Sequence, residues 1–222
     1  MSHKTPNFNE KFEYFIYIDK PNSVNNHNAG TMKIKLPFLI LLTLFSQLSI
    51  AQKKEGHINW EESRPLAWAD FKGRADNSSP FDALTMGNIG YSFEEIKPNT
   101  EYKLILNISF EQKKSWVKSK RDTERLLAHE QLHFDIFELH LRMLVKKIED
   151  EKVLTGLKFS DKLSKVYNKT YGELVKFQEK YDKETNHSKN EEKQKEWQEK
   201  VQKMLDEYKP YAKREIAFKV TK

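Results

Sequence analysis

Two histidines and one glutamate in this chain have the spacing that a single helical turn needs to surround a metal ion. The stretch Ala128-His129-Glu130-Gln131-Leu132-His133 contains the pattern His-Glu-x-x-His. Residues four apart lie one turn above each other on the same face of an α-helix, so both imidazoles can reach one ion. Zinc bound in this way lowers the pKa of a coordinated water toward ~7, and Glu130 is placed to take the proton of that water. The pattern therefore predicts a site for one zinc ion, with His129 and His133 as ligands and Glu130 as the general base.

The simplest alternative is a pair of histidines on a charged, solvated helix surface. Given the His and Glu content of the chain, a chance match to the pattern is expected roughly 0.02 times. Apolar residues recur every three and four positions from about residue 123 to 148, and Asp122 or Thr123 can cap that helix. Because the match falls inside a predicted helix, metal binding is the favoured interpretation.

A third protein ligand has to come from elsewhere in the chain. His140 is nearly in phase with His129, but a rise of ~1.5 Å per residue places it about 10 Å beyond His133. A zinc–nitrogen bond is only ~2 Å long, so we expect His140 at the surface or beside the ligands. His187 is the favoured third ligand, because it lies in a predicted turn between two helices and can fold back onto the motif helix.

Acidic residues close to His187 in the sequence remain open as alternatives. Glu184 and Asp182 carry carboxylates, which also bind zinc. Whichever of these groups does not bind the ion could orient an imidazole. Tyr181 is one of several tyrosines that could stabilise an oxyanion, and the sequence does not select among them.

Two further amphipathic helices are predicted after the motif helix. Gly156 marks a break, and Ser160 can cap the second helix. Residues 185–190 are typical of a turn. A third helix with Trp197 on its apolar side is expected to end at Pro210.

The segment before the motif helix has the pattern of short strands. Residues 102–110, rich in Ile, Leu and aromatics, form its clearest strand. Residues 83–93 indicate another, which Gly87 and Gly90 weaken, and residues 216–220 a last short one. Strands first and helices after them indicate a single α+β domain.

The N-terminal region has the features of an export signal. Residues 32–51 combine a short basic start, an apolar stretch and small residues at the exit, as a secretory signal peptide does. The apolar stretch is shorter than the ~20 residues of a membrane-spanning helix. We therefore expect residues 52–222 to form an exported domain, periplasmic or extracellular, with no stable membrane span. Residues 1–31 are interpreted as an over-extended N-terminus.

The amino-acid composition limits which binding partners and which zinc ligands are expected. Lys and Arg outnumber Asp and Glu by 39 to 33 in 222 residues, and the excess is spread along the chain. No basic stripe with interleaved aromatics is visible, so no nucleic-acid partner is expected. The chain has no cysteine, so zinc ligands must be histidines and carboxylates, and no disulfides support the fold.

Four stretches of the sequence, in this order, resemble the domain-of-unknown-function family 922 (DUF922), regarded as secreted bacterial zinc-dependent proteases. They are residues 66–73, 127–136, 181–187 and, more weakly, 194–197. The resemblance implies a zincin-like fold: a short N-terminal β-sheet, an active-site helix and two further helices. It also implies that the strand at 102–110 borders the cleft, where an extended peptide could add as another strand.

The chain departs from the family pattern at two positions. The family often has glycine where this chain has Leu132 and Ser188. Neither departure removes a proposed ligand, although Ser188 bears on the geometry of the turn at His187.

The leading hypothesis is a secreted zinc-dependent peptidase that hydrolyses bonds in a peptide or protein substrate. One alternative is a non-catalytic envelope module, for binding or structure, in which zinc only holds the helices together. A structural site is usually closed by four protein ligands, whereas a catalytic site keeps a position for water. Another alternative is a metal-free helical adaptor. The sequence defines neither the substrate specificity nor the oligomeric state.

Overall fold

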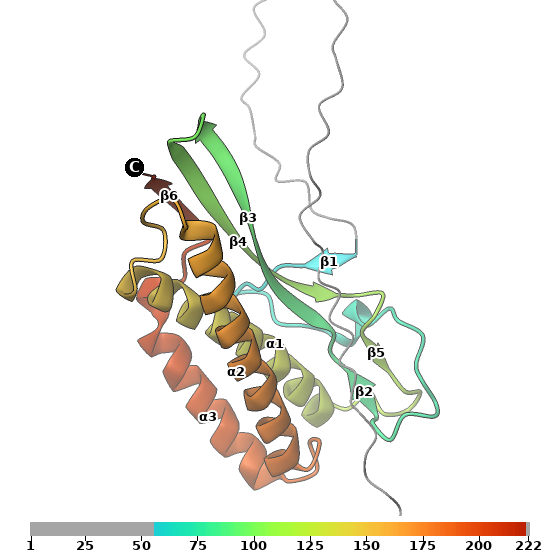
Figure 1. The fold of residues 1–222 in the computed structure, drawn as a ribbon. Helices are drawn as coiled ribbons and strands as arrows, with labels where there is room; N and C mark the ends of the chain where they lie inside the picture. The colour runs from blue at the N-terminus through green and yellow to red at the C-terminus, as the bar shows by residue number, and fades with distance from the viewer. Residues whose placement is uncertain (1–55, 221–222) are drawn as a thin grey trace, which may run out of the picture. The chain divides into compact units, whose positions relative to one another are not determined.

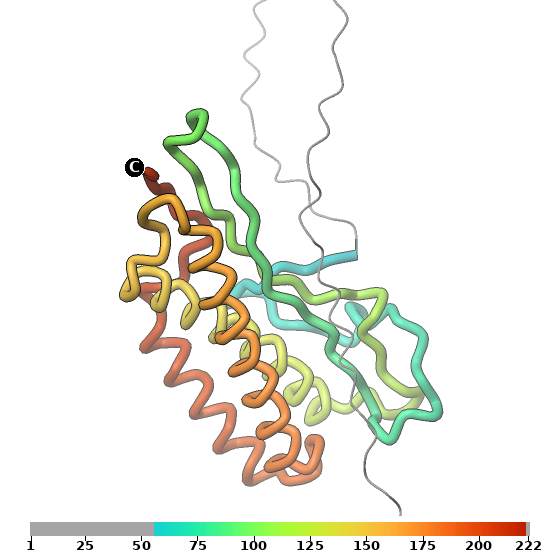
Figure 2. Tube along the Cα trace, viewed as in Figure 1, coloured from blue at the N-terminus to red at the C-terminus, as the bar shows by residue number. Residues whose placement is uncertain are grey.

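The computed structural model describes residues 56–220, which belong to one unit of the chain, Ala51–Lys222. The expected signal peptide at 32–51 and the interpretation of residues 1–31 lie outside the described residues. Figures 1 and 2 show the unit as an antiparallel sheet with helices packed along it.

The main sheet is built around one long hairpin. Its strands are β3 (Gly87–Lys97) and β4 (Glu101–Glu111), which pair in antiparallel register. On its other side β4 pairs with β1 (His57–Ile58) near one end and with β6 (Glu215–Lys219) near the other. The predicted strand at 102–110 is therefore confirmed. Its expected place at the border of a cleft is wrong, because β4 is the central strand and has neighbours on both sides.

A second, two-stranded sheet joins β2 (Ala83–Leu84) to β5 (Trp116–Val117). The predicted strand at 83–93 is thus divided between β2 and β3. Gly87, which weakens that prediction, stands where β3 approaches the motif helix. A Cβ at Gly87 would lie 2.7 Å from the ring of Phe137, so a larger residue would force the ring or the strand to shift.

Three helices follow the strands: α1 (Glu124–Asp150), α2 (Phe159–Thr185) and α3 (Glu191–Glu207). Thr123 caps α1, since its side chain accepts a hydrogen bond from the Leu126 amide, as one of the two sequence alternatives predicts. The predicted cap of α2 at Ser160 is wrong, because the helix already begins at Phe159.

Short helical turns complete the fold on either side of these elements. They are η1 (Trp68–Asp70) and η2 (Lys209–Tyr211), and Pro210 lies within η2, just after the end of α3.

Helix α1 lies at the centre of the packing. It contacts β3 and β4 on one side and α2 and α3 on the other. Its apolar residues join those of β4 that point to the helices in one continuous core. The fully buried members on these two elements include Leu104, Phe110, Ile136, Leu139 and Leu144.

The observed order of elements makes this an α+β fold, as the sequence predicts. The last strand, β6, returns to the sheet after the helices and pairs with β4. None of the helices within residues 56–220 is long and apolar enough to cross a membrane.

Candidate metal centre

The motif histidines lie on the buried N-terminal half of α1. His129 and His133 point the same way, with their Nε2 atoms 3.2 Å apart. The helix is fixed there from two sides. Thr85, between β2 and β3, donates from its hydroxyl to the backbone oxygen of Glu130 at 3.2 Å. On the other side the ring of Tyr181 stacks on that of His129 with centroids 4.6 Å apart.

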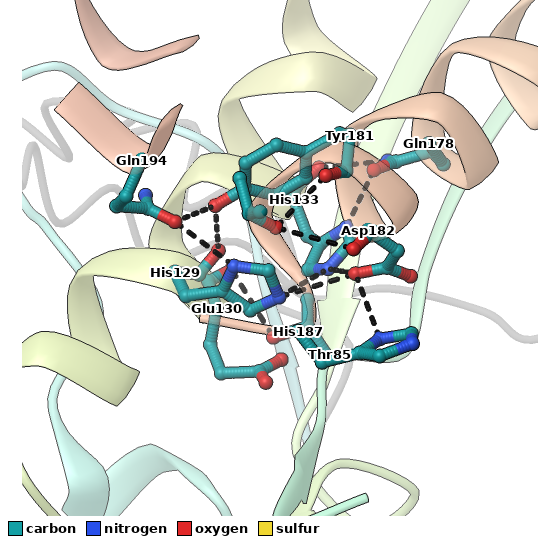
Figure 3. A network of polar contacts seen from close by, with 10 residues as sticks. Thr85, His129, Glu130, His133, Gln178, Tyr181, Asp182, His187 and Gln194 are labelled. Atoms are coloured by element: carbon teal, nitrogen blue, oxygen red, sulfur yellow. Dashed lines mark hydrogen bonds and ion pairs between the residues drawn. The ribbon is translucent and has the colours of Figure 1, made fainter. Parts of the chain in front are cut away.

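Asp182 closes a triangle with the two imidazoles (Figure 3). Its Oδ1 lies 3.1 Å from Nε2 of His129 and 3.0 Å from Nε2 of His133. Asp182 is in the last turn of α2, which packs antiparallel along α1. Among the described residues these three side chains form a group that could hold a metal ion.

The hydrogen bonds behind the imidazoles show that this group suits a cation. Nδ1 of His133 lies 2.5 Å from Oε1 of Gln178, and Nδ1 of His129 lies 3.0 Å from Oε1 of Gln194. An amide oxygen only accepts, so each Nδ1 carries the proton. Both neutral rings then direct an Nε2 lone pair at the carboxylate of Asp182. Three acceptors at mutual distances of 3.0–3.2 Å are close to the ~3.3 Å between ligands that surround zinc tetrahedrally at ~2.0–2.1 Å.

A proton can replace the cation in the metal-free group. Burial alone would lower the pKa of His133. The charge of Asp182 and its hydrogen bond, helped by the charge of Glu130, outweigh burial and raise the pKa to about 9. Burial in turn opposes ionisation of Asp182, but the charge of protonated His133 and its hydrogen bond hold the pKa of Asp182 well below its ordinary value. Bound metal would have to displace the proton of His133.

Glu130 lies beside this group, and no described residue pairs with its carboxylate. It is only 4% exposed. Within residues 56–220 its carboxylate makes no hydrogen bond or ion pair, and Figure 3 shows its end free of contacts. Its oxygens are not among the fully enclosed polar atoms without a partner, so water can reach the carboxylate, which is left free to meet a water molecule or a substrate.

His187, the favoured third ligand from the sequence, is adjacent to the group without being part of the triangle. Its Nδ1 lies 3.5 Å from Oδ1 of Asp182, and its side chain is 42% exposed. Its ring packs on Phe81, with centroids 4.7 Å apart. The turn that carries it is left-handed at three consecutive residues: Asn186, His187 and Ser188 have φ of 47°, 50° and 71°.

The other sequence candidates lie away from the triangle. His140 is 2% exposed, with Nδ1 2.8 Å from the Ile136 backbone oxygen, so the expected surface position is wrong. Burial lowers the pKa of His140. Glu184 accepts a hydrogen bond from the indole of Trp197 at 2.8 Å.

Tyr181 supports the site from within the core instead of facing a substrate. It is fully buried, and its hydroxyl lies 2.8 Å from Oε1 of Gln194 and 3.2 Å from the backbone oxygen of His129. Burial raises the pKa of Tyr181 far above its usual value. Gln178 and Gln194 are the site residues that sequence reasoning missed. A glutamine on an amphipathic helix carries no signal that separates it from a surface residue, although Gln178 lies one turn before Asp182.

Fold and site thus define an α+β domain with a His-His-Asp group on its central helices. A family model described as "Bacterial protein of unknown function (DUF922)" matches residues 81–188, which supports the resemblance to this family that the sequence predicts. The match includes Glu130, the triangle and His187. It excludes the stretches at 66–73 and 194–197. No curated protein and no solved structure matches this chain.

Proposed function

We propose that this protein is an exported, zinc-dependent peptidase with a zincin-like active site. In this proposal His129, His133 and Asp182 hold one zinc ion, and Glu130 is the general base. The observation that carries the proposal is the convergence of three acceptor atoms beside Glu130, whose carboxylate has no hydrogen bond or ion pair among the described residues. Export rests only on the signal-like segment at 32–51, and the peptide substrate on the His-Glu-x-x-His pattern.

Each side chain has a distinct task in the proposed reaction. A zinc ion held here would supply Lewis-acid chemistry, lowering the pKa of a water and polarising the scissile carbonyl. Glu130 would accept the proton of the attacking water and pass it to the amine nitrogen that leaves. Its carboxylate is suited to this because no described donor competes for its oxygens.

The sheet limits where an extended substrate could align. Because β4 is internal, a peptide that adds as a further strand would need another edge. We propose the outer strand β3, whose first residue, Gly87, lies against Phe137 of α1. Part of that edge is already used, since the hydroxyl of Tyr167 donates to the backbone oxygen of Ile89 at 2.8 Å.

The test compares zinc content with hydrolysis in the purified protein. Wild type is expected to hold one zinc and to cleave members of a peptide library. Glu130→Gln should keep the zinc and lose about 10²- to 10⁴-fold in rate. Protein that folds but takes up no zinc would refute the metal site. A zinc-loaded wild type inert on all peptides would refute the peptidase.

A structural zinc site is the second candidate, because His187 is close enough to suggest a fourth protein ligand. Four protein ligands would close the site to water. The catalytic proposal predicts that His187→Ala keeps stoichiometric zinc whereas Asp182→Asn loses it. Loss of zinc and of stability in both variants would favour the structural module.

The same pair of variants also tests the sequence prediction for the third ligand. If His187→Ala loses the zinc and Asp182→Asn retains it, His187 is that ligand and Asp182 is its neighbour. His57→Ala is the matched control, since His57 lies on β1 and contacts Ser109 instead of the triangle.

A further inference from the structure

Two buried glutamines occupy equivalent positions behind the two motif histidines. Gln178, from α2, and Gln194, from the first turn of α3, are 9% and 5% exposed. Each presents its amide oxygen to an Nδ1 atom, at 2.5 Å for His133 and 3.0 Å for His129. Figure 3 shows Gln194 on the opposite side of the His129 ring from Asp182.

The orientation of the Gln178 amide is fixed by its other end. Its Nε2 donates to the backbone oxygen of His133 at 3.0 Å. A backbone carbonyl can only accept, so Nε2 must face it and Oε1 must face the imidazole. The proton of the neutral ring is then held on Nδ1, and Nε2 is left as a lone pair.

Gln194 reaches the same result with a different set of contacts. Its Oε1 is shared by Nδ1 of His129 and the hydroxyl of Tyr181, which lies at 2.8 Å. Its Nε2 is buried and has no hydrogen-bond partner in the part of the chain that the structure describes. In this orientation His129 donates from Nδ1, and the tautomer of His129 distinguishes it from the reversed amide, in which Nε2 of Gln194 would donate to Nδ1.

We propose that Gln178 and Gln194 are positioning residues that hold His133 and His129 as Nδ1–H tautomers, so that both Nε2 lone pairs meet at one point. The purpose of this arrangement rests on the proposed zinc site, but the tautomers can be measured without any metal. Metal-binding histidines commonly donate their second N–H to a carboxylate, a backbone carbonyl or water. Here neutral side-chain amides take that place, and they come from both helices that pack on α1.

The first measurement is the tautomer, read from imidazole ¹⁵N shifts of the metal-free protein. Spectra are recorded well above pH 9, because Asp182 raises the pKa of His133 to about 9 and only the neutral ring has a tautomer that can be read. Wild type should show Nδ1–H on both rings. Gln178→Leu should shift His133 toward Nε2–H and leave His129 unchanged, and Gln194→Leu should do the reverse.

The second measurement is zinc affinity, by competition with a chromophoric chelator. Each Leu variant should bind zinc about 10- to 100-fold more weakly. Gln194→Glu is the conservative variant, since a carboxylate keeps both acceptor contacts and removes the unpartnered amide nitrogen. It should bind zinc at least as tightly as wild type. Gln202→Leu, at an exposed position of α3, is the control for the same change on a helix surface.

The outcomes separate this proposal from the peptidase proposal. Nε2–H tautomers in wild type, or Leu variants that keep both the tautomers and wild-type affinity, would overturn the positioning role. If Leu variants do not fold, a Gln194→Glu protein that loses the Nδ1–H tautomer of His129 would overturn it as well. Wild type with the expected tautomers but no zinc binding would support the positioning role and refute the proposed metal site.

Discussion

Two buried glutamates on α1, eight residues apart, have opposite surroundings. Glu138 is 0% exposed, and each of its oxygens accepts from an arginine: Nε of Arg142 at 2.7 Å and Nη2 of Arg214 at 2.6 Å. Glu130 is nearly as buried, yet no described residue binds its carboxylate. A buried charge is normally paired. Glu138 therefore stabilises the fold through its ion pairs, whereas the proposed function needs the Glu130 carboxylate unpaired, as it is among the described residues.

Pairing at Glu138 extends beyond the carboxylate. Arg142 also donates from Nη1 to the backbone oxygen of Leu205 at 2.6 Å and lies over the ring of Trp60. The cluster therefore joins α1 to the end of α3 and to the segment before η1. The His-His-Asp triangle joins α1 to α2 but contains only acceptors until a proton or a metal ion is added.

The largest effect is expected from removing the charge of Glu138. Glu138→Gln would leave Arg142 buried without a counter-charge, so the free energy of unfolding should fall by about 3–5 kcal/mol. Urea denaturation followed by circular dichroism measures it. Glu149→Gln on the same helix is the control, because its ion pair with Lys213 is exposed and should contribute less than about 1 kcal/mol. If both variants lose the same free energy of unfolding, the structural role inferred for Glu138 is contradicted.

A second effect should follow from pH in the metal-free protein. The pKa of His133 is raised from 6.5 to about 9 by Asp182, so its stabilisation is complete below pH 6.5 and is lost as pH rises through 9. The free energy of unfolding should fall by up to about 3 kcal/mol over that range. His133→Gln should lack this loss. With zinc present the sign reverses, and stabilisation by the metal should grow as the pH rises. If the free energy of unfolding of the metal-free wild type does not change with pH over this range, the ion pair between His133 and Asp182 is contradicted.

A smaller effect is expected at Glu130. Glu130→Gln breaks no hydrogen bond or ion pair within residues 56–220, so the metal-free variant should unfold within about 1 kcal/mol of wild type. Denaturation beside Glu138→Gln gives the comparison directly. A loss above about 2 kcal/mol at Glu130 would mean that its carboxylate has a structural partner after all.

The motif helix could be predicted from sequence because its determinants are local. Periodicity and the Thr123 cap locate α1 almost to the residue, and four-residue spacing brings His129 and His133 together. The strand at 102–110 is equally clear from its composition. Its central place in the sheet is not, because β1 and β6 come from opposite ends of the domain and no local pattern reports such pairing.

The surroundings of the histidines depend on where α2 ends. The sequence places Asp182 and His187 in one short stretch, and either could face the motif helix. Because α2 continues to Thr185, Asp182 stays in helical phase with Gln178 and points at α1, whereas His187 falls beyond the cap at Asn186. His140, on α1, is likewise buried by the way that its helix faces the others, although its polarity alone would predict a position at the protein surface. Helix phase relative to a distant partner is a tertiary property, so the sequence leaves these alternatives open.

The smallest effect is expected in the turn that carries His187. Ser188 is 5% exposed and has φ +71°. A residue with a Cβ is strained in this left-handed conformation, and glycine is not.

Ser188→Gly should therefore raise the free energy of unfolding by about 0.5–1 kcal/mol, after the entropy that glycine adds to the unfolded chain. Ser188→Ala keeps the Cβ and should bring no gain. Neither change should alter zinc stoichiometry, because the triangle is fixed by α1 and α2. If glycine and alanine have equal effects, the Ser188 hydroxyl and not the backbone governs this turn. If glycine stabilises and alanine does not, the strain lies in the backbone beside His187, outside the packed helices that hold the two glutamates.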